Sequence, residues 1–373
     1  MIVRYATSED GKLEKKAELY TAAEHGIRPQ DIDADARLVV DRLQAAGFEA
    51  FIVGGAVRDL LAGRKPKDFD IATSAYPKQI HRVFPRSRII GRRFKLVHVP
   101  FTRNRKQKII EVSTFRADGG GRGNNTYGSL EEDVRRRDFT INALFYNPHK
   151  QLVIDYVGGF KDIKAKRLRT LRPVEESFSE DPVRMIRGVK YAALLGIPLP
   201  FGVTGAIKKY RRELLRCSKE RVTEEVFKIL TSGCAQAFFS TAYRIRLLEV
   251  ILPSLDGFLR RQSQDQEEAE LFRRLSRLDE LMRSEAPAAS GTPLEVPERG
   301  EMLALLFQDL LAERPLEAQE GDPLFHLQAY LRTLSLPLLP SKADLLAAST
   351  ALLKILASAA CPAGAGRKAR RAI

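Results

Sequence analysis

The feature that most constrains the fold of this chain is a glycine turn followed closely by a pair of carboxylates. Gly54 and Gly55 end a short apolar segment, and Asp68 and Asp70 stand two residues apart where a second apolar segment begins. Side chains two residues apart on a strand point to the same face, so the two carboxylates would lie side by side. Two like charges held so close require compensation, which a divalent cation can supply.

The glycine turn predicts a phosphate site beside these acids. Without a Cβ atom, Gly54 and Gly55 let the backbone approach a ligand closely. A helix that begins at Ala56 would point its free N–H groups at a phosphate above the turn, and Arg58 would add a positive charge. An isolated pair of aspartates is more often solvated at a strand edge. The preceding turn instead favours a nucleotide with Mg²⁺, or with Mn²⁺ in its place.

Glu111 is a third candidate acid. It interrupts the apolar segment 109–113, and a buried carboxylate without a partner would be costly. Two interpretations remove that cost. Glu111 could face the same metal ions as the aspartates, or it could form a salt bridge with Arg116.

Charge and composition restrict the class of partner. The 373 residues include 62 Lys and Arg against 47 Asp and Glu, a net charge of +15, which favours nucleic acid as a partner. No apolar run approaches the roughly 18 residues that a membrane-spanning helix needs. Residues 1–10 lack the apolar centre of a signal peptide, so we expect a cytoplasmic protein without membrane association. The three cysteines lack metal-ligand spacing, so no zinc site is predicted.

Apolar spacing divides the chain into an α/β part and a helical part. Residues 1–30 are polar and predict a flexible arm, whereas 31–47 show helical spacing that ends at a glycine. Short apolar segments between residues 48 and 156 predict a small mixed sheet with helices. Beyond Glu180 the pattern is helical. The glycine-rich segment 118–128 predicts a mobile loop, either a solvated linker or a phosphate cradle.

Several sequence blocks follow one another in a fixed order. They are GGAVRD with KDFDIAT (54–59 and 67–73), RRDFTINAL (136–144), DYVGGFKDI (155–163), EDPVRMIRGVKYA (180–192) and ERVTEE (220–225). The first resembles the nucleotidyltransferase motif of the DNA polymerase β superfamily, and the others resemble successive motifs of its class II branch. That branch contains bacterial poly(A) polymerases and CCA-adding tRNA nucleotidyltransferases. The resemblance implies an α+β fold in which a polymerase β-like nucleotidyltransferase domain precedes all-α neck, body and tail-like domains.

The resemblance also implies a division of the chain and a subgroup. Residues 89–99, the segment 25–51 and the basic C-terminal end are similar to the poly(A) polymerase subgroup. The expected parts are a flexible N-terminal arm (1–30), a catalytic head (31–172), a nucleotide-recognition neck (173–235), an RNA-binding body (236–360) and a basic tail (361–373).

The block RRDFTINAL supplies candidate nucleotide contacts. Arg137 and Asp138 could hold ribose hydroxyls, and Asn142 could bond a base or sugar. A strand start with a capping Asp is the alternative interpretation.

The helical blocks supply further candidates. The family uses an Asp and an Arg on one helix as a protein template for the incoming base, which implies that role for Asp181 and Arg184. Both groups match a base edge chemically, but a surface salt bridge is the alternative. Arg187 follows on the same helix, and Arg221 would either reach the triphosphate or brace that helix.

Basic residues outside the blocks are candidate RNA contacts. Their excess positive charge suits phosphate, whatever the sequence of the RNA. They are Arg92 and Arg93 in a basic turn, and Arg367, Lys368, Arg370 and Arg371 in the tail.

These observations predict a cytoplasmic, Mg²⁺-dependent enzyme that transfers AMP from ATP to RNA 3′ ends (mRNA, small RNA or tRNA) and releases pyrophosphate. Asp68 and Asp70 would hold two metal ions, and Glu111 would complete the shell of one. mRNA processing by polyadenylation is the expected role. A tRNA nucleotidyltransferase that adds CCA or the terminal A is the first alternative, and a catalytically inactive RNA-binding relative is the second.

Overall fold

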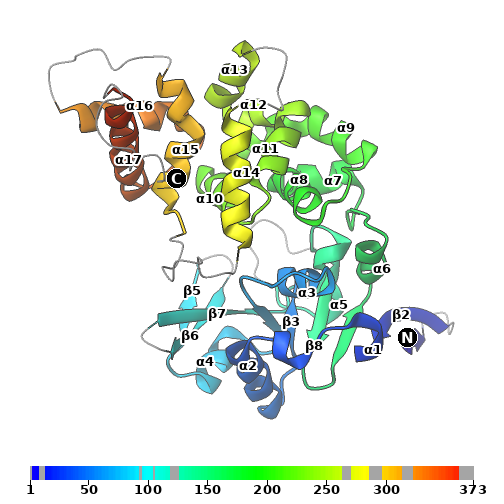
Figure 1. Ribbon diagram of the computed structural model, residues 1–373. Coiled ribbons are helices and arrows are strands. Elements are labelled where there is room, and N and C mark those ends of the chain that lie inside the picture. The colour runs from blue at the N-terminus through cyan, green and yellow to red at the C-terminus, as the bar shows by residue number, and fades with distance from the viewer. Residues whose placement is uncertain are drawn as a thin grey trace. The chain divides into compact units, whose positions relative to one another are not determined.

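The computed structural model describes residues 2–7, 13–91, 95–103, 106–117, 126–262, 270–284, 296–312 and 322–360. The chain forms two compact units (Figure 1). The first comprises residues 1–177 with 195–198, and the second comprises 178–194 with the chain from 199 onward.

A mixed sheet forms the first unit, and its described strands have the order β1-β2-β9-β8-β3-β4-β7-β6-β5. The strands β4 and β7 run parallel, and the other described neighbours are antiparallel. The predicted mixed sheet is therefore confirmed. The strands are β1 (Ile2–Thr7), β2 (Leu13–Tyr20), β3 (Ala50–Val53), β4 (Asp70–Thr73), β5 (Arg88–Ile90), β6 (Leu96–Arg103), β7 (Lys106–Thr114), β8 (Leu144–Asn147) and β9 (Leu152–Asp155).

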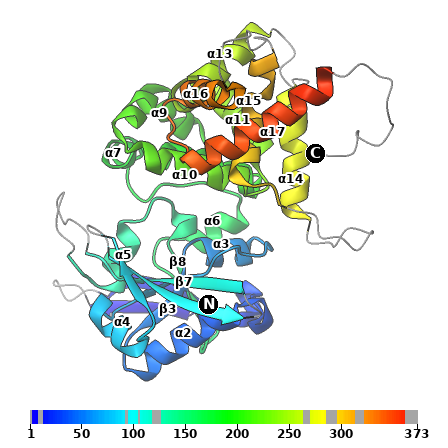
Figure 2. The same cartoon turned by 90° about the vertical axis from the view of Figure 1, so that its left-hand side faces the viewer.

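The helices of this unit are short. Helices α2 and α4 lie side by side on one face of the sheet (Figures 1 and 2). The helical segments are α1 (Ala22–His25), η1 (Pro29–Asp31), α2 (Ala34–Ala45), α3 (Gly55–Leu61), α4 (Pro77–Val83), α5 (Leu130–Arg135), η2 (Thr140–Asn142), α6 (Gly159–Lys164) and α7 (Val174–Glu180), of which α7 continues into the second unit.

Local sequence explains the elements that lead to the glycine turn. The Asp33 carboxylate accepts the backbone N–H groups of Asp35 and Ala36 at 3.0 and 3.1 Å, which starts α2. The apolar side chains Val39 and Leu43 of this helix are fully buried. Strand β3 is buried along its length and leads directly into α3. The predicted helix and strand therefore form, within three residues of the expected limits.

The prediction of an irregular N-terminal arm is wrong for the described part of residues 1–30. Strand β2 joins the sheet by pairing with β9, for example Leu19 with Ile154. Glu18 is 4% exposed, and its carboxylate accepts a hydrogen bond from Lys161 Nζ at 2.6 Å. The Tyr20 ring stacks on Phe160 with centroids 3.9 Å apart. Polar residues can thus occupy buried strand positions, because residues far away in the sequence supply their hydrogen-bond partners. Composition alone does not predict such a strand.

The second unit is helical throughout its described residues, as the sequence predicts. Asp279 on α14 accepts the first backbone N–H groups of α11, from Ala235 at 2.6 Å and Gln236 at 2.9 Å, and so ties two helices together. None of the described helices combines the length and apolarity that crossing a membrane requires. The elements are α8 (Val183–Leu195), α9 (Phe201–Tyr210), η3 (Arg211–Arg216), α10 (Lys219–Leu230), α11 (Ala235–Arg244), α12 (Leu248–Ile251), α13 (Pro253–Arg261), α14 (Glu270–Arg283), α15 (Arg299–Ala312), α16 (Pro323–Ser335) and α17 (Lys342–Ala360).

Candidate active site

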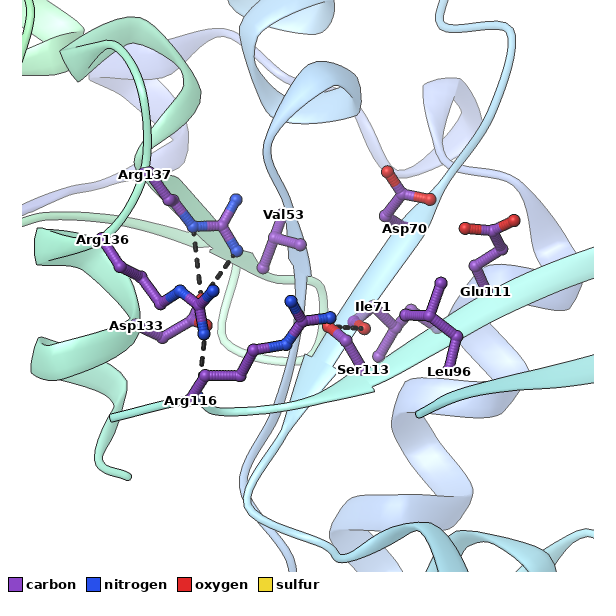
Figure 3. A pocket seen from close by; sticks show the side chains of 10 residues that line it. All are labelled: Val53, Asp70, Ile71, Leu96, Glu111, Ser113, Arg116, Asp133, Arg136 and Arg137. Atoms are coloured by element: carbon purple, nitrogen blue, oxygen red, sulfur yellow. Dashed lines mark hydrogen bonds and ion pairs between the residues drawn. The ribbon is translucent and has the colours of Figure 1, made fainter. Parts of the chain in front are cut away.

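A pocket of about 230 Å³ opens on the sheet of the first unit. Figure 3 shows the carboxylates of Asp70 and Glu111 at one side of it, and three guanidinium groups together with the Asp133 carboxylate at the other. The lining residues are Val53, Asp70, Ile71, Leu96, Glu111, Ser113, Arg116, Asp133, Arg136 and Arg137.

Two of the three predicted acids face this pocket. In the parallel pairing of β4 with β7, Ile71 is opposite Val112, so Asp70 and Glu111 occupy equivalent positions one residue earlier. Ile71 and Val112 are fully buried, and alternation along each strand turns the two acids toward the other face. Figure 3 shows both carboxylates directed into the same space.

The expectation that Glu111 is buried is wrong. Its side chain is 48% exposed, and its Oε1 lies 3.4 Å from Nε2 of His98, the residue opposite it on β6. The apolar residues around Glu111 belong partly to the other face of the strand, which removes the burial cost that the sequence suggested. The contact with His98 also takes the place of the predicted salt bridge with Arg116.

Asp68 lies outside the pocket lining. It is exposed and precedes β4, which begins at Asp70. Within the described ranges, no three His, Cys, Asp or Glu side chains come together as a metal-binding group. The structure thus brings together Asp70 and Glu111, and a ligand role for Asp68 stays a prediction.

Three arginines form the basic side of the pocket. Arg137 is held by Asp133, with Nη2 at 2.9 Å from Oδ2, and its Nη1 donates to the Asn142 carbonyl at 3.1 Å. Its guanidinium also lies 4.9 Å from the centre of the Phe145 ring. Burial and neighbouring Arg137 lower the pKa of Arg116, which Asp133 partly opposes. Sequence reasoning missed Arg116, Asp133 and Arg136 as lining residues, although Arg136 is the first residue of the block RRDFTINAL.

The glycine turn has the backbone that only glycine adopts readily. Gly54 has φ +66° and ψ −122°, and a Cβ atom there would lie 3.2 Å from Nη1 of Arg137. Gly55 begins α3, as the sequence predicted within one residue. A side chain at position 54 would therefore strain the backbone and displace a pocket arginine.

Arg58, Asp138 and Asn142 form a buried network behind the turn. Arg58 Nη1 donates to Asn142 Oδ1 at 2.8 Å, and Asn142 Nδ2 donates to Asp138 Oδ1 at 2.9 Å. All three are at most 7% exposed, and none lines the pocket. Asp138 also accepts the Phe139 N–H at 2.7 Å, which matches the capping alternative. These contacts hold the three side chains in place, and direct contacts with a nucleotide stay predictions for them.

The predicted template residues belong to the second unit. Asp181 precedes α8 and accepts from Arg221 Nη2 at 2.7 Å, so Arg221 braces this segment. This hydrogen bond raises the pKa of Arg221, although burial opposes the shift. Arg184 Nη1 donates to Glu180 at 2.7 Å, and Arg187 lies 3.4 Å from Glu225. Salt bridges therefore involve all four predicted residues, while base recognition stays a prediction.

The predicted RNA contacts belong to parts of the chain that the structure does not describe. Arg92 and Arg93 lie outside the described residues, as do the four basic residues of the tail and most of the segment 118–128.

Known proteins with similar sequences identify the fold. Residues 50–169 match the family described as the poly A polymerase head domain, and residues 203–259 match a probable RNA and SrmB-binding site of polymerase A. The poly(A) polymerase I of Haemophilus influenzae is 38% identical over 275 residues, which cover 69% of this chain and 60% of that enzyme. The CCA-adding enzyme of Bacillus velezensis is 37% identical over 226 residues, which cover 59% and 56% of the two chains.

A solved structure agrees with these sequence matches. The crystal structure of the Bacillus stearothermophilus CCA-adding enzyme in complex with CTP has a TM-score of 0.60 at 29% identity, covering 87% of this chain and 69% of that one. The sheet, its paired acids and the following helices define the fold of a class II nucleotidyltransferase. The chain carries a poly A polymerase head domain and is similar to the poly(A) polymerases I and the CCA-adding enzymes, which confirms the predicted resemblance. It spans 60% of the Haemophilus influenzae poly(A) polymerase I and 53% of one from Escherichia coli.

Proposed function

We propose that this protein is a cytoplasmic enzyme of mRNA processing that transfers AMP from ATP to RNA 3′ ends and releases pyrophosphate. The observation that carries the proposal is the division of the pocket by charge, with Asp70 and Glu111 facing three arginines. A nucleoside triphosphate with its metal needs both groups, because acids hold the cation and guanidinium groups hold phosphate. The 38% identity with a poly(A) polymerase I supports ATP and RNA as substrates.

The acid side of the pocket fits Mg²⁺. Carboxylate oxygens are the donors that Mg²⁺ prefers, and at nucleotide sites one or two carboxylates usually act together with substrate phosphates. Asp70 and Glu111 supply two such groups, and Asp68 is the third proposed ligand. When bound, the ions would activate the RNA 3′-hydroxyl and stabilise charge on the leaving pyrophosphate, and Mn²⁺ could serve the same purpose.

The remaining residues position the substrates. Arg137, fixed by Asp133 and by the Asn142 carbonyl, would meet the triphosphate in a preset orientation. Preset charges stabilise a transition state because they need no reorganisation during the reaction. Asp181 and Arg184 would recognise the adenine edge, with Arg221 orienting Asp181.

The test is AMP incorporation by an Asp70→Asn variant, which keeps the size of the side chain and removes its charge. Activity should fall by roughly three or more decades, because several kcal/mol of barrier lowering depend on the metal ligand. The matched control is Asp41→Asn, an exposed acid on α2 outside the pocket, which should keep full activity. Normal turnover by Asp70→Asn would refute the proposal.

Addition of CCA to tRNA is a second candidate function, because the structure resembles a CCA-adding enzyme over 87% of this chain. Each nucleotide can be offered with an oligo(A) primer and with tRNA that lacks its CCA end. A long ladder from ATP alone supports polyadenylation. Extension of tRNA that stops after one to three nucleotides would instead support tRNA repair and would contradict polyadenylation.

A further inference from the structure

A second, strongly basic pocket lies within the helical unit. It has a volume of about 560 Å³ and is formed by α9, η3, the C-terminal end of α11 and α13. Figure 2 labels α9, α11 and α13 in its upper part. Five of its six lining residues are cationic. The lining residues are Lys208, Arg211, Tyr243, Arg244, Arg246 and Arg260.

Two of the five cations are matched by carboxylates of the same unit. Arg260 donates to both oxygens of Asp256, at 2.7 and 2.9 Å, and its guanidinium lies 4.6 Å from the centre of the Tyr243 ring. Arg211 lies 3.5 Å from Glu249 and donates to the Lys208 carbonyl. These contacts fix two guanidinium groups in place and neutralise them.

The other three cations leave the pocket with an unmatched positive charge. Lys208, Arg244 and Arg246 are exposed, and none has an ion-pair partner among the residues that the structure describes. The pocket therefore carries a net charge of about +3 when the two paired acids are counted. Concentrating cations in a concave site costs electrostatic energy, which a bound anion would offset.

The backbone at Arg246 points to the same conclusion. Arg246 follows the end of α11 with φ +67°, in the left-handed region that glycine adopts without cost. Non-glycine residues seldom adopt this region, and Gln151 and Lys166 are the other described residues of this chain that do. The chain thus keeps a guanidinium where local geometry favours glycine.

We propose that this pocket, which shares no lining residue with the reaction pocket, binds a phosphodiester group of the RNA backbone. The inference rests on the proposed function, which supplies the RNA. Guanidinium forks match phosphate oxygens two at a time. Tyr243, the aromatic lining residue, is 5% exposed beneath Arg260 and is not available to stack on a base. Recognition is therefore of charge and independent of base sequence, and the match of residues 203–259 to a probable RNA-binding family supports it.

The test compares Arg246→Gly with the parent protein in binding a labelled oligo(A) over a salt series. Loss of one phosphate contact should weaken binding about threefold at low salt and reduce the salt slope by about 0.7 to 1. The melting temperature should stay the same or rise, because glycine suits the left-handed backbone. Arg244→Gln should behave alike in binding. Arg332→Gln on α16, an exposed arginine outside the pocket, removes the same charge and should change neither quantity.

Unchanged affinity and salt slope in both pocket variants would overturn the inference. A second contrary result is also possible. If both pocket variants bind RNA normally but lose binding to poly-glutamate, the pocket serves an acidic protein segment, and the inference of an RNA site is overturned. Inorganic phosphate added alone should compete only weakly, since one phosphate lacks the contacts of a chain. Arg246→Gly should raise the primer concentration needed for half-maximal AMP incorporation, whereas Asp70→Asn should abolish incorporation at every primer concentration. Failure of the RNA site is thereby separated from failure of the proposed reaction.

Discussion

At the scale of single residues, the site depends on buried side chains that do not line the pocket. The side-chain amide of Asn142 accepts from Arg58 and donates to Asp138, and the backbone carbonyl of Asn142 accepts from Arg137. An amide is the group that can accept from an arginine and donate to a carboxylate at once. Asn142 therefore links the glycine turn to a pocket arginine.

Replacing Asn142 with Ala should lower the free energy of unfolding by about 1–3 kcal/mol. The variant removes a partner from the Arg58 guanidinium and from the Asp138 carboxylate, both buried, and such losses cost about this much. Urea unfolding measures the change. In a cycle with Asp138→Ala, the double variant should lose less than the sum of the single losses, because both remove the same bond. Strict additivity would contradict the network.

A second residue-scale prediction concerns Glu225, which is 6% exposed beside Lys190 at 2.5 Å and Arg187 at 3.4 Å. Burial raises the pKa of Glu225, but the two cations outweigh it, so the pKa in the folded state lies below the usual value. The stabilisation is therefore present above the unfolded-state pKa and is lost as pH falls through the folded-state pKa.

Glu225→Gln should thus destabilise the protein by roughly 3 kcal/mol near neutral pH, since it removes the negative partner of a buried ion pair. The difference from the parent protein should shrink as the pH falls below the ordinary pKa of a glutamate and through the lowered folded-state pKa of Glu225, where the parent carboxylate also becomes protonated. Urea unfolding at several pH values between neutral and acid measures this. A difference that stays constant over the whole range would be inconsistent with an ionised Glu225 in the folded state.

At the scale of elements, helix packing in the second unit depends on close approach. Gly300 on α15 faces α17, where an added Cβ atom would lie 2.4 Å from the Ala347 Cβ and 2.7 Å from the Asp344 carbonyl oxygen. Real Cβ atoms do not approach backbone so closely, so the two helices can meet here only without a side chain at position 300.

Gly300→Ala should therefore destabilise the helical unit by about 1–3 kcal/mol, the usual cost of overpacking. The matched control is Gly205→Ala on α9, where no atom lies within 4 Å of the added Cβ. That change should stabilise the protein by about 0.4–1 kcal/mol, because alanine restricts the unfolded chain. Thermal unfolding of both variants decides the matter, and equal effects would argue against the close helix contact.

Sequence patterns predicted the elements whose causes are local. Helix α2 and strands β3, β4, β7 and β8 follow from apolar periodicity and from nearby caps and glycines. Strand β2 was not predicted, because the strand it pairs with and the partner of Glu18 lie far away in the sequence. The prediction that Glu111 is buried was wrong for a related reason, since the neighbours of a strand determine which of its faces is buried. Asp70 lines the pocket and was already a candidate from local sequence, whereas the place of Arg116 in the lining depends on the fold.

At the scale of the whole molecule, charge is the dominant property. The net charge of +15 acts on any polyanion before specific contacts form. RNA binding should therefore weaken steeply with salt, and affinity measured at about 50 and 200 mM salt tests this. Similar affinity at both concentrations would count against binding through phosphates.

Removing residues 366–373, which carry four basic side chains in the sequence, should weaken RNA binding more than ATP binding. Charge near the C-terminal end would add phosphate contacts, whereas the residues that line the reaction pocket belong to the first unit. Binding titrations of both ligands to the truncated and full chains compare the two effects. A larger loss for ATP would contradict this role of the tail.

The parallel ladder between β4 and β7 has a consequence for how this chain can vary. Because the two strands run in the same direction, Asp70 and Glu111 stand at matching steps of one ladder. Inserting or deleting one residue within either strand would rotate a carboxylate into the hydrophobic interior and separate the pair. Length changes in related chains should therefore collect in the connection between the two strands, residues 74–105, and spare the strands themselves.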